Sequence, residues 1–226
     1  MDRILQRVRV DVNEKIYLKD PFSSDLGKDI VLKSMDMMLA LGFENFTFKK
    51  LAQAVGCTEA AIYRYFENKH KLLLYLFGWY WGFLEQNLVY CTANLTSARQ
   101  KLEIAIELLA KGPIFSKNDF IDPVKLRRLL TDESTKAIMT KEVDKEQKLG
   151  FFHQYYKLGE RIAELISAYN PEYEFPKTLV TTIMEASLMQ TYYENHLPGL
   201  TEKGDGHDKK VIFFNHLVFK TIAHES

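Results

Sequence analysis

The chain has 226 residues, of which 46% are hydrophobic and 13% aromatic, and its 30 basic and 30 acidic side chains leave no formal net charge. A chain of this length and apolar content can bury a substantial core, which excludes a wholly disordered protein. Zero net charge also excludes a protein that coats nucleic acid with its whole surface, so any site for a polyanion must be a local basic patch.

The cysteines, the histidines and the start of the chain indicate the cellular setting. Cys57 and Cys91 have neither the spacing of a zinc site nor that of a disulfide framework, so we expect a reducing cytosol and two small buried side chains. The six histidines include no pair at metal-ligand spacing beside a carboxylate or thiolate, so neither a metal site nor a cofactor is predicted. The first residues lack the apolar core of a signal peptide, and no apolar stretch is long enough to span a membrane, so a cytoplasmic protein is expected.

Residues 1–22 form the first segment. Val8, Val10 and Val12 alternate with charged residues, which is compatible with a short extended arm or an edge strand. Because chain ends are often loosely held, a mobile tail is favoured over both.

An amphipathic helix and two short helices are expected next. The first is capped by one of residues 23–25 and stops at Gly42, and the second, FKKLAQAV, begins after Thr47 and stops at Gly56. Thr58 can cap a third helix, EAAIYRYF, only two residues after that glycine. So short a connection between two helices indicates a helix-turn-helix.

Helical periodicity also dominates the rest of the chain, with almost no strand signal. Asn68 is expected to cap a long apolar helix, and proline and glycine pairs separate the helices that follow. An all-α fold is therefore predicted, with the later helices at about 97–111, 123–130, 140–169, 175–196 and 208–224.

The third helix carries an unusual outer face. Ile62 and Phe66 are four residues apart and should point inward, which leaves Tyr63 and Arg64 outward. Tyrosine and arginine can hydrogen-bond phosphates or base edges, and the neighbouring alanines permit close approach to a grooved surface. The alternative is that the aromatic residues from Tyr63 to Phe66 are ordinary core side chains of a helical bundle. The motif around these residues disfavours that interpretation.

Basic side chains surround this helix. Helix N-termini at Thr47 and Thr58 offer backbone N–H groups that favour phosphate. Residues 47–71 hold five basic side chains and two acidic ones, so the segment forms a patch of net charge +3 inside a neutral chain. The basic residues are Lys49, Lys50, Arg64, Lys69 and Lys71, and the acidic ones are Glu59 and Glu67. The segment is predicted to bind DNA.

The run GFENFTFKKLAQAVGCTEAAIYRYFENKHKLL resembles the N-terminal helix-turn-helix of the tetracycline-repressor (TetR-type) family of bacterial transcriptional regulators. The features that match are Gly42-Phe43, Thr47, Leu51-Ala52, Gly56, the run from Tyr63 to Phe66, and Lys69. The sequence departs from the commonest family pattern at Phe46, Cys57 and Ala60.

This resemblance implies a set of DNA-contacting residues and a domain organisation. Phosphate contacts are implied for Thr47, Thr58, Tyr63, Tyr65 and Lys69, and proximity to base edges for Glu59, Ala60, Ala61 and Arg64; Lys49 joins the set from the basic patch. The expected organisation is an N-terminal arm (1–22), a helix-turn-helix DNA-binding domain (23–70) and a larger ligand-binding and dimerisation domain (71–226).

Aromatic side chains of the larger domain suit a small apolar or amphipathic ligand, although core packing is the commoner use of each one. The predicted ligand pocket comprises Trp79, Phe83, Phe115, Phe120, Phe152, Tyr155 and Met184. The last helix carries two apolar stripes, more than one buried side requires, so the last two helices are predicted to form a homodimer. The predicted interface comprises Ile183, Leu188, Val211, Phe214, Val218 and Ile222.

The function that these features predict is a sequence-specific transcriptional regulator, and the resemblance implies a repressor. It would bind a palindromic operator as a homodimer and be released by a small-molecule ligand. No nucleophile elbow, phosphate loop, dinucleotide fingerprint or histidine-glutamate metal motif is present, so no enzyme is predicted. Two alternatives stay open: a helical binding or scaffolding protein with a vestigial helix-turn-helix, and an enzyme of unrecognised type that uses the aromatic cavity.

Overall fold

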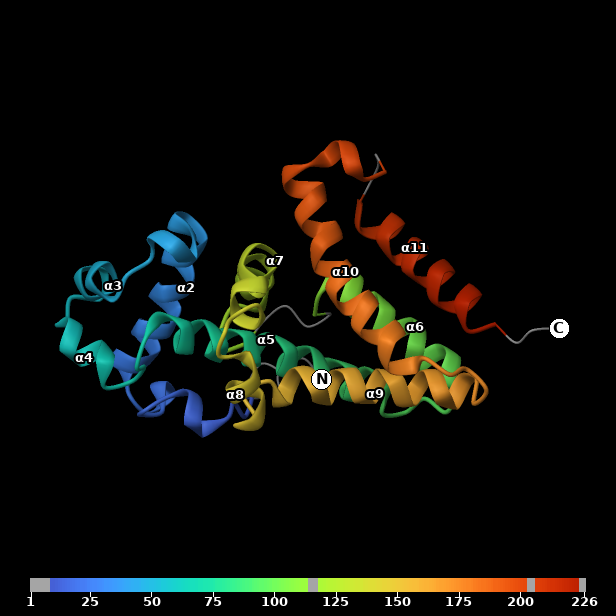
Figure 1. The fold of residues 1–226 in the computed structure, drawn as a ribbon, viewed down its shortest axis with the longest axis horizontal. Helices are drawn as coiled ribbons and strands as arrows, with labels where there is room; N and C mark the ends of the chain where they lie inside the picture. Colours follow the sequence, from blue (N-terminus) through green and yellow to red (C-terminus); the bar gives the residue numbers. More distant parts are fainter. Residues whose placement is uncertain (1–8, 114–117, 203–205, 224–226) are drawn as a thin grey trace. The chain divides into compact units, whose positions relative to one another are not determined.

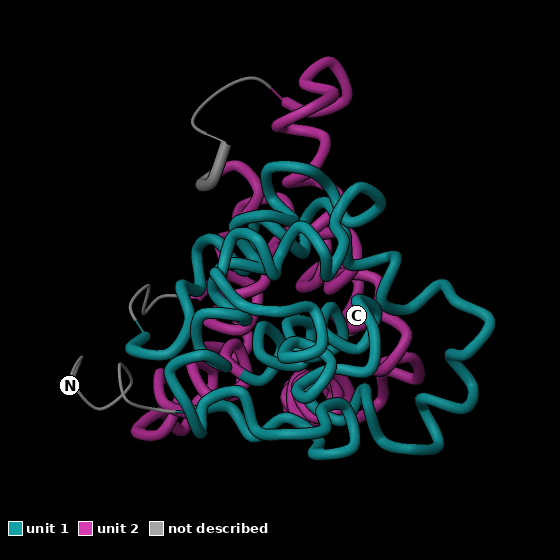
Figure 2. Tube along the Cα trace, turned by 90° about the vertical axis from the view of Figure 1, so that its left-hand side faces the viewer, with its two compact units in different colours: residues 1–82, 115–154 teal, residues 83–114, 155–226 magenta. Residues whose placement is uncertain are grey.

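A computed structural model of the chain describes residues 9–113, 118–202 and 206–223. Over these ranges the chain is helical and contains no strand, so the predicted all-α fold is confirmed (Figure 1). The chain divides into two compact units: unit 1 spans Met1–Gly82 and Phe115–Gln154, and unit 2 spans Phe83–Ile114 and Tyr155–Ser226 (Figure 2). No helix in the described ranges combines the length and the apolar character needed to cross a bilayer.

Unit 1 contains the first three α-helices, of which the second and third are short, and segments from further along the chain. Its elements are η1 (Glu14–Ile16), η2 (Pro21–Ser23), α2 (Asp25–Asn45), α3 (Phe48–Val55), α4 (Glu59–Tyr63), the first part of α5 (Lys69–Thr92), α7 (Pro123–Ile138), α8 (Val143–Lys148) and the start of α9 (His153–Tyr169). The expected segments 1–22 and 23–70 therefore share one compact unit with α7 and α8. Their division by function stays a prediction.

Unit 2 is built from the remainder of α5 and α9 and from three further helices. These are α6 (Ala98–Lys111), α10 (Pro176–His196) and α11 (Gly206–Thr221), with the short η3 (Pro198–Leu200) after α10. Helices α6, α10 and α11 contact one another pairwise. Their buried side chains form the core of this unit.

Local sequence signals fix the starts of the first helices. The side chains of Ser24, Thr47, Thr58 and Asn68 each accept a hydrogen bond from the backbone N–H three residues later. Such a bond satisfies one of the N–H groups that a helix start leaves without an intrahelical partner. The predicted caps at these four positions are confirmed.

Two glycines with positive φ shape the helices differently from the prediction. Gly42 has φ +75° and kinks α2, which continues to Asn45. Gly150 has φ +79°, a conformation that favours glycine, and it separates α8 from α9. The single helix predicted over 140–169 was therefore wrong, whereas the helix predicted at 123–130 is longer and ends at Ile138.

The two cysteines are free thiols of intermediate exposure, which corrects the expectation that both are buried. Desolvation raises the pKa of the Cys57 thiol, and desolvation with the nearby Glu107 charge raises the pKa of the Cys91 thiol. Both thiols are therefore protonated at neutral pH.

Candidate nucleic-acid interface

Helices α3 and α4 form the helix-turn-helix that the sequence predicts (Figure 1). Helix α3 stops at Gly56, whose φ of +80° favours glycine and whose N–H donates to the Ala52 carbonyl at 2.9 Å. Thr58 then caps α4, and α3 contacts both α2 and α4. Ile62 is fully buried, as its predicted inward position requires.

The outer side of α4 carries the most distinctive side chains of the predicted set. Tyr63 is 46% exposed, and its ring packs edge-on against the buried Phe48 ring, with centroids 5.1 Å apart. Its hydroxyl lies 3.5 Å from Glu59 Oε1. Because the Tyr63 ring is supported by α3 and its side chain is exposed, Tyr63 is suited to contact a flat or grooved surface. The exposed members of the predicted set are Thr47, Lys49, Thr58, Glu59, Ala60, Tyr63 and Arg64, and Ala61 is half-buried.

Tyr65 does not share this exposed face. It is 3% exposed, its hydroxyl lies 2.7 Å from Ser24 Oγ, and the Lys19 ammonium lies 5.2 Å from its ring centroid. The phosphate contact implied for Tyr65 is corrected to a packing position next to α4, because the hydroxyl is turned into the unit.

Lys69 and Lys71 also turn inward. Lys69 Nζ donates to the carbonyls of Phe43, Glu44 and Phe46 at 2.8, 3.1 and 3.3 Å, so it satisfies acceptors at the end of α2. Lys71 Nζ lies 3.0 Å from Glu146 Oε1, and the Lys71 side chain is only 15% exposed. The patch of net charge +3 predicted from residues 47–71 counted both lysines. The exposed basic side chains on this part of the structure are Lys49, Lys50 and Arg64.

This difference between lysines predicts two kinds of variant. Lys49→Ala should reduce the slope of log affinity against log salt for duplex DNA by about 1, because one phosphate contact is lost. It should leave the thermal midpoint unchanged. Lys69→Ala should instead lower the midpoint, because three carbonyls at the end of α2 lose their donor. Binding titrations over a salt series and thermal unfolding followed by circular dichroism measure both. A reduced salt slope for Lys69→Ala without loss of stability would restore its predicted phosphate contact.

Glu146 on α8 was not singled out from the sequence. It is 2% exposed, and both carboxylate oxygens lie 3.1 Å from His70 Nε2, while Oε1 also contacts Lys71. This carboxylate joins α8 to the first turn of α5. Acidic residues beside it, such as Glu142 and Asp144, are exposed, so the sequence held no signal that distinguished Glu146.

Glu133 on α7 plays a similar part at the kink of α2. Its side chain is 7% exposed, Oε1 accepts the Phe43 N–H at 2.8 Å, and Oε2 lies 2.7 Å from Lys136 Nζ. Lys136 also lies 3.6 Å from a carboxylate oxygen of Glu44. Two of these contacts, Glu133 with Phe43 and Lys136 with Glu44, are long-range and hold α2, and through it the helix-turn-helix, to α7.

The residues of the predicted ligand pocket occupy packed positions in both units. In unit 1, the Trp79 and Phe120 rings lie 6.1 Å apart and both contact Phe22, at 5.5 and 5.2 Å. Phe152 packs edge-on against Phe77. Phe115 lies outside the described residues.

In unit 2, Phe83 and Met184 are buried, and the Tyr155 hydroxyl donates to Glu185 Oε1 at 2.6 Å. Desolvation and this hydrogen bond raise the pKa of Tyr155. These positions are typical of core packing, the alternative that the sequence left open for each aromatic residue.

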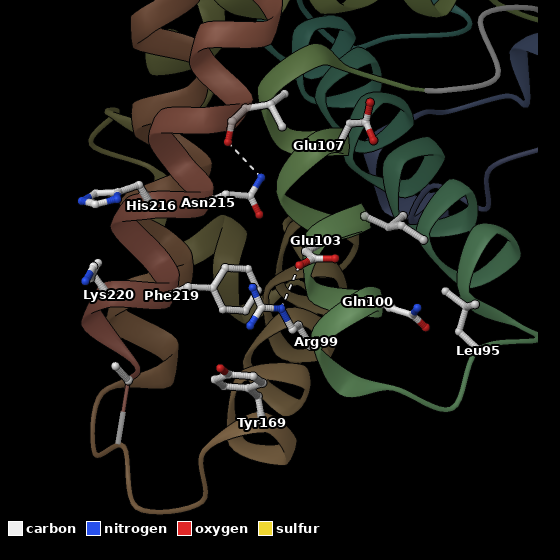
Figure 3. Close-up of a pocket in the computed structure, with 13 residues that line it drawn as sticks. Leu95, Arg99, Gln100, Glu103, Glu107, Tyr169, Asn215, His216, Phe219 and Lys220 are labelled. Atoms are coloured by element: carbon white, nitrogen blue, oxygen red, sulfur yellow. Dashed lines mark hydrogen bonds and ion pairs between the residues drawn. The ribbon is translucent and has the colours of Figure 1, made fainter. Parts of the chain in front are cut away.

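A groove in unit 2 is lined by other residues. It has a volume of about 870 Å³ and lies between α6 and α11 (Figure 3). The Arg99 guanidinium lies 4.8 Å from the Phe219 ring centroid and pairs with Glu103 at 3.0 Å, and the Tyr169 ring packs edge-on against Phe219. On α11, Asn215 Nδ2 donates to the Val211 carbonyl at 2.9 Å. The sequence missed this groove because spaced polar residues on α6 are typical of a solvated helix face.

The predicted dimer residues are mostly covered by their own chain. Ile183, Leu188, Phe214, Val218 and Ile222 are at most 3% exposed, and Val211 is half-buried. The choice of residues is therefore corrected, because side chains already buried in unit 2 cannot supply a surface to a partner. The last two helices and the segment after α10 expose other apolar side chains, here called the α10–α11 apolar residues: Met189, Leu197, Leu200, Ile212 and Phe213, which are 40–67% exposed.

Comparisons with known proteins agree with this geometry. Residues 31–76, from α2 to the first turns of α5, match the family model described as bacterial regulatory proteins, tetR family. A search of curated proteins gave no significant match.

Solved structures share the fold over most of the chain. A tetR-family regulatory protein from Rhodococcus RHA1 has a TM-score of 0.64 at 11% identity, covering 90% of this chain and 100% of its own. The fatty acid degradation regulator FadR from Bacillus halodurans has a TM-score of 0.63 at 16% identity, covering 89% and 98%. AibR, in complex with isovaleryl coenzyme A and operator DNA, has a TM-score of 0.56 at 14% identity, covering 84% and 96%.

The capped helix-turn-helix and its exposed Tyr63 and Arg64 define a DNA-binding protein. The match over residues 31–76 confirms that this segment resembles the helix-turn-helix of bacterial regulatory proteins of the tetR family, and the solved structures share the fold of the chain.

Proposed function

We propose that this regulator binds a palindromic operator as a homodimer in the bacterial cytoplasm and represses transcription until a small ligand releases it. The observation that carries this proposal is the exposed side of α4, where Tyr63 and Arg64 are exposed at the C-terminal end of a helix that Thr58 caps at its start. Two such faces, related by a two-fold axis and about 34–36 Å apart, would read the two halves of a palindrome.

Exposed apolar side chains of the last two helices support the dimer. The α10–α11 apolar residues, Met189, Leu197, Leu200, Ile212 and Phe213, expose apolar surface that a second copy of the chain would remove from water. A two-fold interface requires the same surface on both subunits, and two adjacent helices of one subunit can pack on the same two of another.

The groove between α6 and α11 supports a small ligand. Its volume of about 870 Å³ is in the usual range for small-molecule sites, about 300–1,000 Å³. The aromatic rings of Tyr169 and Phe219 suit an apolar part of a ligand, and the Arg99 and Lys220 side chains suit an anionic group. An amphipathic ligand is therefore proposed for unit 2. The structure of AibR was determined with isovaleryl coenzyme A, a ligand of mixed character.

The mechanism that we infer is a shift between two populations. Ligand and operator each favour a different arrangement of the dimer, so each lowers the affinity of the other by the same factor. If saturation with every compound of a broad screen left operator affinity unchanged, release by a ligand would have to be abandoned.

Selection of bound duplexes from a random DNA pool tests the DNA-binding role. The wild-type protein should recover a palindrome, and Tyr63→Ala and Arg64→Ala should each lower affinity for it at least about tenfold, the lower end of the cost of losing one good contact. Arg128→Ala is the matched control, because Arg128 is an exposed arginine of unit 1 on α7, outside the helix-turn-helix.

The scaffolding alternative makes the opposite prediction for the same four proteins. A vestigial helix-turn-helix would show only weak, sequence-independent binding that vanishes with salt and is equal in all four. The enzyme alternative would require turnover that survives loss of Tyr63 and Arg64.

A further inference from the structure

Residues 9–20, here called the arm, run along α5 in unit 1 and are not the mobile tail favoured from the sequence; residues 1–8 lie outside the described residues. Val10 and Val12 are 2% and 4% exposed. A Cβ atom at Gly82 would lie 2.4 Å from Val10 Cγ1, and one at Gly78 would lie 3.2 Å from Val12 Cγ1. The two valines therefore fill space that two glycines leave on α5.

The distance between Val10 and Val12 along the arm matches the distance between Gly82 and Gly78 along α5. Four residues of α-helix rise about 6 Å, and two residues of extended chain rise about 6.6 Å. Val10 at Gly82 and Val12 at Gly78 thus place the arm antiparallel to α5 in one register. The Tyr17 ring continues the series against Tyr75, edge-on with centroids 5.8 Å apart.

The C-terminal end of the arm is bonded to the end of α4. The Leu18 N–H donates to the Tyr65 carbonyl at 2.8 Å, and Tyr65 directly follows Arg64, the C-cap of α4. The Tyr65 ring also packs closely against α2, because a Cβ atom at Gly27 would lie 2.8 Å from Tyr65 Cε1. Any shift of the arm along α5 would therefore be transmitted to Tyr65, which directly follows the C-cap of α4.

The N-terminal half of the arm has a second attachment. Asn13 Nδ2 donates to the Leu149 carbonyl at 2.9 Å, and Gln154 Nε2 donates to the Asp11 carbonyl. Leu149 and Gln154 flank the break between α8 and α9. The arm is thus fixed at α5, at α4 and at the α8–α9 connection (Figure 1).

We propose that the arm is a positioning element for the DNA-binding face, which sets the direction of α4 by holding Tyr65. A helix of five residues has no independent stability, so the direction of α4 must come from its contacts. This inference rests on the proposed function. The arm's own side chains need not touch DNA; Leu18 acts through its backbone and Tyr65.

Leu18→Pro tests the proposal in the full chain. Proline removes the N–H that Tyr65 accepts, and Tyr17, with φ −125° and ψ 156°, already has the extended backbone that a following proline requires. Leu18→Ala is the matched control, because it keeps the N–H and the Leu18 side chain is 68% exposed. Affinities are measured for the selected palindrome and for an unrelated duplex of equal length.

Leu18→Pro should lower affinity for the palindrome about tenfold and leave affinity for the unrelated duplex within about twofold, because the basic surface is intact and only its placement changes. Leu18→Ala should behave as wild type. The readout is the ratio of the affinity for the palindrome to the affinity for the unrelated duplex. A purely structural role would not change this ratio, since partial unfolding lowers both affinities together.

Gly82→Ala is the second variant, because its Cβ would displace Val10 at the other end of the arm. Gly159→Ala is its control, since the nearest atom to that Cβ is 3.8 Å away. The proposal is supported if Leu18→Pro and Gly82→Ala lower the ratio of the two affinities alike. It is overturned if both variants bind the palindrome as wild type does, or if both affinities fall in parallel with helical content. A wild-type protein that selects no duplex would instead remove the proposed function, and this inference with it.

Discussion

Phe66→Ala is expected to lower the free energy of unfolding by about 3–5 kcal/mol, the range for deleting a buried aromatic ring. Phe66 is fully buried, its ring packs edge-on against Tyr75 of α5 with centroids 5.4 Å apart, and its N–H donates to the Ile62 carbonyl. The ring thus joins α4 to α5, and its loss leaves a cavity between them. Urea denaturation followed by circular dichroism measures the change.

The comparison variant is Phe66→Leu, which keeps most of the apolar volume and should cost less than about 1.5 kcal/mol. Since native proteins are stable by about 5–15 kcal/mol, Phe66→Ala should also reduce the folded fraction on mild heating, and operator binding with it. Equal denaturation midpoints for the alanine and leucine variants would show that the cavity collapses and that Phe66 does not join the two helices as described.

Glu146→Ala is expected to cost about 3 kcal/mol, the lower end of the range for breaking a buried ion pair. The substitution leaves Lys71 and His70 without their carboxylate in a site where their side chains are 15% and 22% exposed. Residual access to water keeps the cost at the lower end. The loss should appear as a lower urea midpoint and as faster proteolysis near the start of α5.

Glu142→Ala provides the matched control on the same short segment. Glu142 pairs with Lys145 at 3.7 Å, but their side chains are 63% and 75% exposed, so removing the pair should cost between 0 and about 1 kcal/mol. The double variant Glu146→Leu, Lys71→Met should regain much of the loss, because no buried charge is then left unpaired. If Glu146→Ala and Glu142→Ala were equally stable, the inward ion pair would contribute nothing measurable.

The parts of the fold that the sequence predicts are those set by neighbours in the chain. Ser24, Thr47, Thr58 and Asn68 cap helices through the N–H three residues away, and such bonds need only local geometry. Tyr63 and its exposed neighbours follow from the position of Ile62 on a short helix. The helix-turn-helix was accessible from the sequence for this reason.

Contacts between distant segments were not accessible in the same way. Glu133 bonds the Phe43 N–H across 90 residues, and Glu146 contacts His70 across 76. The residues next to each glutamate in the sequence do not indicate that its side chain is buried. The same limit explains Lys69: the motif fixes its place in the sequence, whereas its carbonyl partners at the end of α2 become visible only when the helices pack.

The dimer residues illustrate a third limit. Hydrophobic periodicity shows that α11 has two apolar stripes, but it cannot show which stripe the chain itself covers. The structure buries Phe214, Val218 and Ile222 and exposes Ile212 and Phe213. The pattern correctly predicted that α11 has more apolar surface than one buried side requires. It did not correctly predict which side of the helix is exposed.

The composition of unit 1 limits where this chain can be joined to another chain of the same fold in a chimera. A chimera with its crossover at residue 70 would transplant α2, α3 and α4 without α7 and α8, so Phe43 would lose Glu133, and His70 would lose Glu146. The compact module is instead discontinuous, since Met1–Gly82 is completed by Phe115–Gln154. A graft of the whole unit therefore needs a junction in α5 after Gly82 and two more, one before Phe115 and one after Gln154.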